Sequence, residues 1–544
     1  MTTEPVGQDL TLTHLDPAPP GDARLEVVLQ GLTEGSHTVG LALNGIEIGS
    51  LTFAGQARGK TTIALHPSQL QAGSNQVSLV SRGGELDVSA VDTIRLTYWH
   101  TYTADDDQLR CTVPGGQMVT LTGFSNPRIG VVDITDPQAP QRLSDTVRPS
   151  GTGYTFTFSA PGSGGRILLA FAEDRTPAPA AVIPHQPSDW HQPSHAADLV
   201  MISHPTFLES ARPLQALHEG QGMQVALINV EALYAEFSFG AKTPWALRAF
   251  LQQAATRWQR PPRFALLLGG ASVDPKNFLG FGDLDFVPTK LVDTTLLETA
   301  SDDWFADFSG SGVPAIAIGR LPVRTVTEAA TVVQKLVTYA QAPPGGPAST
   351  TALLVADGND EFNFEAASSE AATWVPPGLR VQRIDTGQLG FSDARRALLG
   401  NLNEGPRLVH YIGHGSVEVW DGDGLLSAAD ADTLTNGAQL PLVVAMTCLN
   451  GLFQDPGSES LAAALLTAPS GGAVAVWASS GLTEPAAQAP IDQAFLQRLG
   501  TETGVALGEA ARAAKAATSD LDVSRTWIFF GDPALRWVPP PAGQ

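Results

Sequence analysis

Cysteine is scarce in this chain, which has Cys111 and Cys448 as its two thiols among 544 residues. Two cysteines cannot build a disulfide framework, and they cannot supply a zinc site that needs several cysteine ligands. The sequence therefore excludes a small disulfide-stapled fold and a zinc-ribbon type of protein. Each thiol has to be interpreted on its own.

Basic residues are also few. Lys and Arg number 32 against 55 Asp and Glu, which gives a net charge of −23. A surface with this excess of negative charge repels nucleic-acid phosphates and anionic lipid headgroups. We therefore expect no nucleic-acid partner.

Long apolar runs are missing as well. No segment approaches the roughly 20 apolar residues that a transmembrane helix needs. The first residues, MTTEPVGQDL, lack both the basic and the apolar stretch of an export signal. The sequence thus predicts no membrane span, and it carries no signal peptide as given.

The chain does contain enough apolar sequence for several cores. Hydrophobic residues make up 43% of it and charged residues 16%, a balance that favours globular structure over disorder. At about 150 residues per domain, the length predicts roughly three or four domains.

The first part of the chain is predicted to be all-β. After a flexible tail over residues 1–20, short segments rich in Val, Leu, Ile and Thr alternate with turns, which predicts a β-sandwich over residues 21–104. Asn44-Gly45 is the clearest turn signal, because both positions of a type I′ hairpin need a positive φ. Residues 105–172 form either a second β unit or a continuation of the sandwich.

A proline-rich segment over residues 173–196 is predicted to be a linker, since repeated proline disfavours both helix and strand. Beyond it, compact apolar runs alternate with helical stretches. This pattern predicts an α/β region with a mainly parallel sheet, in two subdomains over residues 197–345 and 346–540. In such folds the functional residues follow the carboxyl ends of the strands.

Two of these strand ends carry reactive side chains. One apolar run is followed by Gly413-His414-Gly415-Ser416, and another leads to Cys448. If the two strands are neighbours, an imidazole and a thiol emerge at the same edge of the sheet. The imidazole would promote formation of the attacking thiolate and would protonate a leaving amine. The structural alternatives are a buried cysteine that acts as a small hydrophobe and a Gly-His-Gly segment that is only a turn.

The α/β part resembles the gingipain-like cysteine peptidases, peptidase family C25, which have a caspase-like fold. The resemblance extends from about Asp198 to Trp537. The segments that carry it are FALLLGG, AIGRLPVRT, HYIGHGSVEVW, LPLVVAMTCLNGLF, GGAVAVWASSG and TWIFFGDPAL. It implies a caspase-like catalytic domain with cysteine peptidase activity.

The resemblance also implies roles for individual residues. His414 corresponds to the general acid and base and Cys448 to the nucleophile, while the backbone amides of Gly415 and Cys448 correspond to the oxyanion hole. Asp357 stands where better-known members have a glutamate that orients the histidine. Capping after a strand is the alternative role for Asp357.

A substrate pocket is implied in the same way. Its lining corresponds to Ile412, Met446, Thr483 and Glu484. Glu365 falls near the place where arginine-specific members carry the aspartate that selects a basic P1 side chain. Specificity for arginine or lysine stays open at this point.

The sequence suggests one metal ion, a calcium ion with a structural role. Asp421 and Asp423 lie in the run WDGDG and offer oxygen ligands at alternate positions, as a calcium loop does, and the family often binds structural calcium. The run lacks the later bidentate glutamate of an EF-hand loop, so a solvated turn is the alternative. No cofactor is required for the expected chemistry.

Three other residues receive structural interpretations. His410 lies four residues before His414 on the same strand and is predicted to be a hydrogen-bonded core histidine. Asp532, which precedes Pro533, is predicted to form a turn. Cys111 is predicted to be a lone thiol of the β region.

The expected function is that of a cysteine endopeptidase that hydrolyses protein or peptide substrates through a Cys448 acyl-enzyme. The alternative is an inactive caspase-like scaffold whose β region binds carbohydrate or protein. Known members of the family are made as zymogens and are mostly secreted. The resemblance therefore implies self-processing of the N-terminal region and a secreted or cell-surface location.

Overall fold

The structure, a computed structural model, forms two compact units, Met1–Pro184 and His185–Gln544. The residues that it describes are 5–84, 86–179, 181–182, 187–341 and 350–537. The division between the units falls inside the proline-rich segment that was predicted to be a linker. The predicted boundary between residues 345 and 346 lies outside the described residues. No helix within these ranges has both the length and the hydropathy needed to cross a bilayer.

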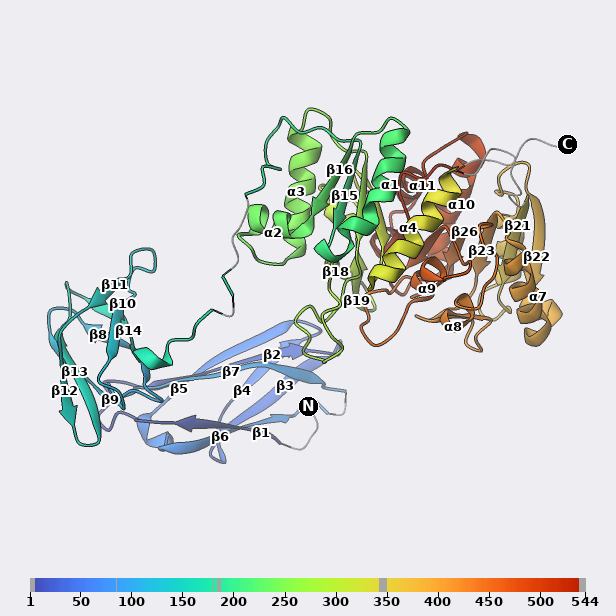
Figure 1. The fold of residues 1–544 in the computed structure, drawn as a ribbon. Coiled ribbons are helices and arrows are strands. Elements are labelled where there is room, and N and C mark those ends of the chain that lie inside the picture. The colour runs from blue at the N-terminus through green and yellow to red at the C-terminus, as the bar shows by residue number, and fades with distance from the viewer. Residues whose placement is uncertain (1–4, 85, 180, 183–186, 342–349, 538–544) are drawn as a thin grey trace. The chain divides into compact units, whose positions relative to one another are not determined.

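The N-terminal unit begins with a β-sandwich whose two sheets have the strand orders β1-β6-β3-β4 and β5-β2-β7 (Figure 1). Leucine and valine side chains from both sheets share one buried cluster, so the sheets pack face to face. The strands are β1 (Val6–Leu12), β2 (Ala23–Gly31), β3 (Ser36–Leu43), β4 (Ile46–Ala54), β5 (Arg58–Leu65), β6 (Gly73–Ser81) and β7 (Ser89–Thr97), with a 3-10 turn η1 (Pro67–Gln69).

The predicted hairpin turn joins β3 to β4. Asn44 has a φ of 51° and Gly45 a φ of 81°, as a type I′ turn requires. The prediction of this hairpin is confirmed.

A second β unit follows, with its own buried cluster. Its sheets have the orders β11-β10-β14-β8 and β12-β13-β9, so this segment is not a continuation of the first sandwich. The strands are β8 (Gln108–Pro114), β9 (Met118–Phe124), β10 (Ile129–Asp133), β11 (Gln141–Leu143), β12 (Thr146–Ser150), β13 (Gly153–Ser159) and β14 (Gly165–Ala172), followed by the 3-10 turn η2 (Glu173–Arg175).

The flexible tail predicted over residues 1–20 is wrong for Val6–Leu12. These residues form β1, which pairs antiparallel with β6 from Val6 opposite Leu79 to Leu12 opposite Gly73. The strand lies at the edge of its sheet and is mostly exposed. Because an edge strand buries few side chains, its sequence shows little of the apolar alternation that would have identified it.

The C-terminal unit is built on a ten-stranded sheet with the order β16-β15-β17-β20-β28-β27-β26-β23-β21-β22. Its neighbouring strands run parallel, except that β27 and β28 run antiparallel. The strands are β15 (Leu199–Ser203), β16 (Val225–Asn229), β17 (Phe264–Leu268), β20 (Ala317–Leu321), β21 (Thr351–Ala356), β22 (Arg380–Asp385), β23 (Leu408–Ile412), β26 (Leu442–Met446), β27 (Ala475–Ser479) and β28 (Trp527–Phe530). Two small hairpins consist of β18 (Lys290–Asp293) with β19 (Glu298–Ser301) and β24 (Val419–Trp420) with β25 (Leu426–Ser427).

The sheet has two halves that run in opposite directions. One half contains β16, β15, β17, β20 and β28, and the other contains β27, β26, β23, β21 and β22. A single residue pair, Arg320 with Phe530, links β20 to β28, and β28 is antiparallel to β27. The predicted mainly parallel sheet is confirmed.

Helices cover both faces of this sheet (Figure 1). Leu199 and Met201 of β15 share one buried cluster with Leu214 of α1. The alternate residues of the same strand, including Val200, share the other cluster with Leu247 of α3. Both faces of the strands are therefore buried, which is why they read as continuous apolar runs.

The helices lie between the strands along the chain. They are α1 (Leu208–Gly220), α2 (Val230–Ser238), α3 (Pro244–Arg257), α4 (Val326–Gln341), α5 (Phe364–Ala371), α6 (Thr386–Leu389), α7 (Phe391–Glu404), α8 (Ala428–Ala431), α9 (Leu461–Thr467), α10 (Pro485–Thr501), α11 (Leu507–Ala514) and α12 (Leu521–Thr526), with 3-10 turns η3 (Pro205–Phe207), η4 (Asp303–Phe305) and η5 (Lys515–Ala517). α3 has a regular start, because the Thr243 side chain accepts a hydrogen bond from the Trp245 amide and Pro244 is the first helical residue.

Arg320 is a fully buried cation in the middle of this unit. Its guanidinium forms two hydrogen bonds to the Asp302 carboxylate, of 2.5 and 2.9 Å. It also donates to the backbone carbonyls of Gly269 at 2.6 Å and Val287 at 2.9 Å. The residue thus ties β20 to the loops that follow β17.

Substitution Arg320→Met should destabilise the C-terminal unit by about 3–5 kcal/mol, because Asp302 would remain as a buried, unpaired charge. Urea unfolding of the full chain would measure the loss. The matched control is Arg257→Met, at an exposed position of α3, which should change stability by less than about 0.5 kcal/mol. Equal effects of the two substitutions would contradict this account.

Candidate active site

Three neighbouring strands bring the predicted reactive residues to one edge of the sheet. β23 pairs parallel with β26, and Ile412 lies opposite Met446. His414 and Cys448 each follow two residues later in the chain. On the other side of β23, Ala356 of β21 lies opposite Ile412, so that the next residue of β21, Asp357, reaches the same edge.

The Gly-His-Gly segment is required by close packing. A Cβ atom on Gly413 would lie 2.4 Å from both the Asp357 Cβ and the Tyr411 hydroxyl, and one on Gly415 would lie 2.5 Å from the Thr447 hydroxyl. Real Cβ atoms essentially never come this close to other heavy atoms. The two glycines therefore let the histidine loop lie against its neighbouring strands.

Tyr411 fixes the backbone of His414 while leaving its ring accessible. The Tyr411 hydroxyl donates to the His414 carbonyl at 2.6 Å, and the Tyr411 ring stacks on Trp420 with 4.3 Å between centroids. The His414 side chain itself is 60% exposed. Its position is thus set by the backbone, and the imidazole stays open to a substrate.

Two carboxylates contact His414 in different ways. Asp357 accepts a hydrogen bond from the His414 backbone N–H at 3.0 Å, whereas the imidazole Nε2 contacts the Asp360 carboxylate at 2.7 Å. The sequence assigned the orienting role to Asp357 and did not single out Asp360. Both residues belong to the run VADGND, and nothing in that run distinguishes the one whose side chain meets the ring.

The two carboxyls also differ in their acidity. The Phe362 amide and the His414 ring lower the pKa of Asp360. Burial raises the pKa of Asp357, and the nearby Asp421 raises it further, against the hydrogen bond from the His414 amide. Asp360 is therefore the better anionic partner for the imidazole. Because the Asp360 carboxylate accepts from Nε2–H, the neutral ring carries its lone pair on Nδ1.

Cys448 begins a tight turn after β26. Leu449, the next residue, has a φ of 60°, a left-handed conformation that is strained for a branched side chain. The Leu449 N–H donates to the Gly481 carbonyl at 3.1 Å, and the Gly451 N–H donates to the Ser479 carbonyl at 2.7 Å. These bonds hold the turn against the end of β27 and the residues that follow it.

The surroundings of the Cys448 thiol disfavour its ionised form. Burial raises its pKa, and the Glu484 carboxylate adds to the rise, while hydrogen bonding from the Thr483 amide opposes it. The sulfur lies 3.4 Å from the Thr483 carbonyl, to which the S–H donates. A base is therefore needed to generate the thiolate.

Asn450 links the cysteine turn to the histidine loop. Its side-chain amide donates to the Ser416 carbonyl at 2.6 Å and to the Val419 carbonyl at 3.1 Å. The side chain is 1% exposed. The sequence contained Asn450 in the cysteine motif without a role for it, because a contact between two loops is not visible in one sequence.

The two amides predicted to form an oxyanion hole are those of Gly415 and Cys448. Within the described part of the chain, neither N–H donates a hydrogen bond to another protein group. Both donors follow the ends of adjacent strands, β23 and β26.

The predicted pocket residues occupy different environments. Ile412 and Met446 end their strands and are buried, with exposures of 5% and 1%. Thr483 contacts the Cys448 sulfur, and Glu484 is exposed next to it, at the start of α10. Glu365 lies on α5 and accepts a hydrogen bond from the Gln388 side chain at 3.3 Å.

Asp421 and Asp423 lie in the turn between β24 and β25. The Asp421 N–H donates to the His414 carbonyl at 2.8 Å, so this turn supports the histidine loop. Among the described residues, neither carboxylate belongs to a group of three or more His, Cys, Asp or Glu side chains whose ligand atoms lie close enough to share an ion.

His410, Asp532 and Cys111 have structural rather than catalytic surroundings. His410 is fully buried and its Nε2 lies 2.9 Å from the Asp492 carboxylate, which confirms a hydrogen-bonded core histidine. Asp532 caps a turn by accepting from the Ala534 N–H, as predicted, and it also pairs with the buried His218. Cys111 is unpaired, and burial raises its pKa to about 11.

Comparisons with known proteins agree with this architecture. The sequence model of peptidase family C25 matches residues 192–538. Among curated proteins, no sequence match is found. The crystal structure of the Arg-specific cysteine proteinase gingipain R (RgpB) is similar, with 18% sequence identity, a TM-score of 0.52 and coverage of 65% of this chain and 80% of that chain.

Two other solved structures give similar values. A complex of the pro- and mature domains of RgpB from Porphyromonas gingivalis shows 18% identity and a TM-score of 0.52, over 62% of this chain and 79% of that chain. A structure described as a protease shows 15% identity and a TM-score of 0.51, over 62% and 78%. At these identities the likeness establishes a gingipain-like, caspase-type fold, and the family match covers more than half of the chain. The chain therefore belongs to peptidase family C25 and is a cysteine-type peptidase.

Proposed function

We propose that the protein is an endopeptidase in which Cys448 is the nucleophile and His414 the general acid and base. The observation that carries the proposal is the parallel register of β23 and β26, which brings the only thiol of the C-terminal unit and an exposed imidazole to adjacent strand ends. A thiol and an imidazole at one edge are the two groups that thiol acyl transfer needs.

The reaction would begin with a proton transfer. His414 accepts the proton of the Cys448 thiol at Nδ1, and the thiolate attacks the carbonyl carbon of the scissile peptide bond. The negative charge that develops on the carbonyl oxygen is stabilised by the amides of Gly415 and Cys448. The imidazolium then gives its proton to the leaving amine, and a thioester remains on Cys448.

Water completes the cycle. His414 removes a proton from a water molecule as it attacks the thioester, and the tetrahedral adduct collapses to a carboxylic acid and the free thiol. Asp360 is proposed as the residue that orients the imidazole, because its carboxylate contacts Nε2 and leaves Nδ1 for the thiol. Asp357 is proposed to position the backbone of the same residue.

The Cys448→Ala variant should lose peptide hydrolysis by at least about 10⁴-fold, because removal of a nucleophile leaves only the contribution of binding and the oxyanion hole. A fluorogenic peptide library with basic, acidic and apolar P1 residues would measure the loss and the P1 preference together. Cys111→Ala is the matched control, at the other thiol of the chain, and should keep full activity. If the Cys448→Ala variant cleaves as well as the parent, the proposal fails. If the parent itself cleaves no peptide of the library, the protein is an inactive scaffold and the proposal fails as well.

Substitution of Glu484 should change the pH dependence of Cys448 alkylation. The Glu484 carboxylate raises the pKa of the thiol, so Glu484→Gln should lower that pKa. The rate of reaction with iodoacetamide should then rise several-fold near neutral pH, and its midpoint should move to lower pH. Glu365→Gln is the control, since Glu365 is not among the groups that influence the thiol. An unchanged midpoint in the Glu484 variant would contradict the assignment.

Substitution of Asp360 and substitution of Asp357 should have different effects on the kinetics of peptide hydrolysis. Asp360→Asn removes the charge beside the His414 ring and should lower kcat by roughly 100-fold with little change in KM. Asp357→Asn keeps an oxygen that can accept from the His414 amide, so it should cost less than about 10-fold. Steady-state measurements on folded variants, checked by circular dichroism, would compare them. A larger loss for Asp357→Asn than for Asp360→Asn would reverse the two assignments.

A further inference from the structure

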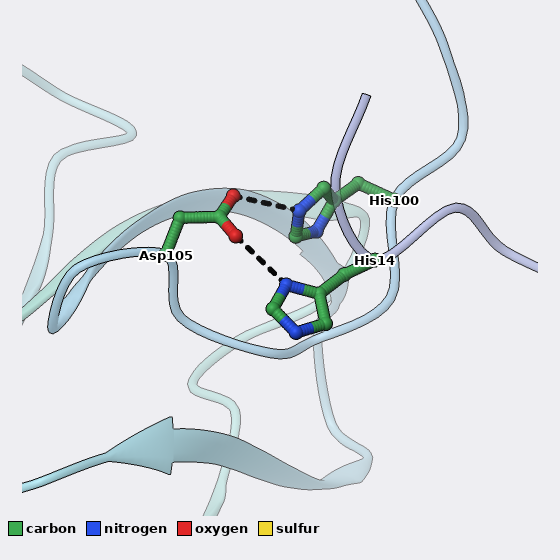
Figure 2. Close-up of side chains that lie close together, drawn as sticks. All are labelled: His14, His100 and Asp105. Atoms are coloured by element: carbon green, nitrogen blue, oxygen red, sulfur yellow. Dashed lines mark hydrogen bonds and ion pairs between the residues drawn. The ribbon is translucent and has the colours of Figure 1, made fainter. Parts of the chain in front are cut away.

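Three side chains with metal-binding groups meet in the N-terminal unit, away from the candidate active site. His14 lies in the loop after β1, His100 follows β7, and Asp105 precedes β8. Figure 2 shows the Asp105 carboxylate facing both imidazole rings. Within the described residues, this is the only group of three or more His, Cys, Asp or Glu side chains whose ligand atoms are close enough to share an ion.

The geometry of the cluster is that of one carboxylate shared by two imidazoles. His14 Nδ1 lies 2.7 Å from Asp105 Oδ1, and His100 Nε2 lies 3.0 Å from Asp105 Oδ2 (Figure 2). The ligand atoms of all three residues lie within 4.8 Å of one another. The three ligand atoms are therefore close enough to share one ion.

The hydrogen bonds of His100 show that a proton or a metal ion is needed between its Nε2 and Asp105. His100 Nδ1 lies 2.5 Å from the Thr101 carbonyl oxygen, which can only accept, so Nδ1 carries the hydrogen. In the neutral ring, Nε2 is then an unprotonated lone pair. That lone pair faces a carboxylate oxygen at 3.0 Å. Two acceptors at this separation repel each other unless a proton or a metal ion lies between them.

We infer that His14, His100 and Asp105 form a zinc site. Imidazole nitrogen suits Zn²⁺ and related transition metals, whereas Ca²⁺ and Mg²⁺ need six or more oxygen ligands. At Zn–N and Zn–O bonds of about 2.0–2.1 Å, tetrahedral ligand atoms lie roughly 3.3 Å apart. The N–O separations of 2.7 and 3.0 Å are shorter than this, so each ring would move away from the carboxylate by roughly 0.3–0.6 Å to admit the ion.

Outer contacts hold the ligands in the orientation that a metal site needs. The Thr13 hydroxyl donates to Asp105 Oδ2 at 2.8 Å, and the Thr101 carbonyl fixes the tautomer of His100. Metal-binding histidines usually donate their second N–H to a carbonyl or carboxylate in this way. His14 has a φ of 43°, a left-handed backbone that is uncommon outside glycine and that accompanies the inward turn of its ring.

The site is partly open to water. The side chains of His14 and Asp105 are 42% and 41% exposed, and that of His100 is 19% exposed. Three protein ligands leave one tetrahedral position, which a water molecule or a partner group would fill.

The position of the site indicates what the metal would do. His14 follows the edge strand β1, while His100 and Asp105 lie in the connection from the first β-sandwich to the second β unit. Hydrogen bonds between these segments are already present, with the Thr101 N–H donating to the His14 carbonyl at 2.9 Å. The zinc ion would fasten the end of β1 to this connection.

Equilibrium dialysis of the full chain against Zn²⁺ tests the inference. The protein would carry Cys448→Ala, so that the nucleophile neither binds zinc nor cleaves the chain, and it would have no polyhistidine tag. One zinc ion per chain should bind after chelator treatment. The His14→Gln and His100→Gln variants should lose this ion, and Thr13→Ala should weaken its binding roughly 10- to 100-fold.

A control and a second readout keep the result clear. His66→Gln replaces another exposed histidine of the same sandwich and should retain the full zinc content. Co²⁺ added to the parent should give visible absorption bands of a four-coordinate site, and these bands should be absent in His100→Gln. If the parent binds no stoichiometric zinc, or if the two ligand variants bind as much as the parent, the inference is overturned and the imidazole pair holds a proton instead.

Discussion

The candidate active site depends on the parallel, in-register pairing of β21, β23 and β26. Ile412 lies opposite both Ala356 and Met446, and the strands are buried on both faces. A shift of one residue would exchange the side chains of the two faces, and each side chain would then have to pack against neighbours that fit a different shape. The hydrophobic core therefore fixes the register, and the register in turn fixes which loop residues share the sheet edge.

Residues of the strand ends and of the loops beyond this edge have different roles. Tyr411, Asp357 and Asn450 act on backbone atoms and hold the histidine loop and the cysteine turn together. Asp360 acts on the imidazole itself. Burial raises the pKa of the Cys448 thiol, which disfavours the thiolate. In the proposed mechanism, His414 is the base that generates the thiolate when a substrate is bound.

The sequence was informative where burial produces a pattern. Strands such as Leu408–Ile412 are covered on both faces, and their apolar runs predicted the sheet and the two reactive strand ends. The edge strand β1 was missed because it buries few side chains. The antiparallel direction of β28 was not predicted, because pairing direction depends on the path of the chain between strands rather than on local composition.

The finer parts of the candidate site could not be predicted from the sequence, because they depend on contacts between loops. Asp357 and Asp360 are three residues apart in one loop, and only the fold shows that the second meets the ring. The contact from Asn450 to Ser416 and the meeting of His14 with His100 and Asp105 join segments that are distant in the sequence. Such contacts produce no pattern that can be recognised in a single amino-acid sequence.

The central claim is that a substrate becomes covalently attached to Cys448. Acid quenching during turnover of a slow ester or peptide substrate, followed by intact-mass measurement and peptide mapping, would test it most directly. The account predicts an acyl adduct in thioester linkage on the peptide that contains Cys448, at a level that rises before product accumulates. Turnover without any adduct on Cys448, or an adduct confined to another residue, would contradict the account.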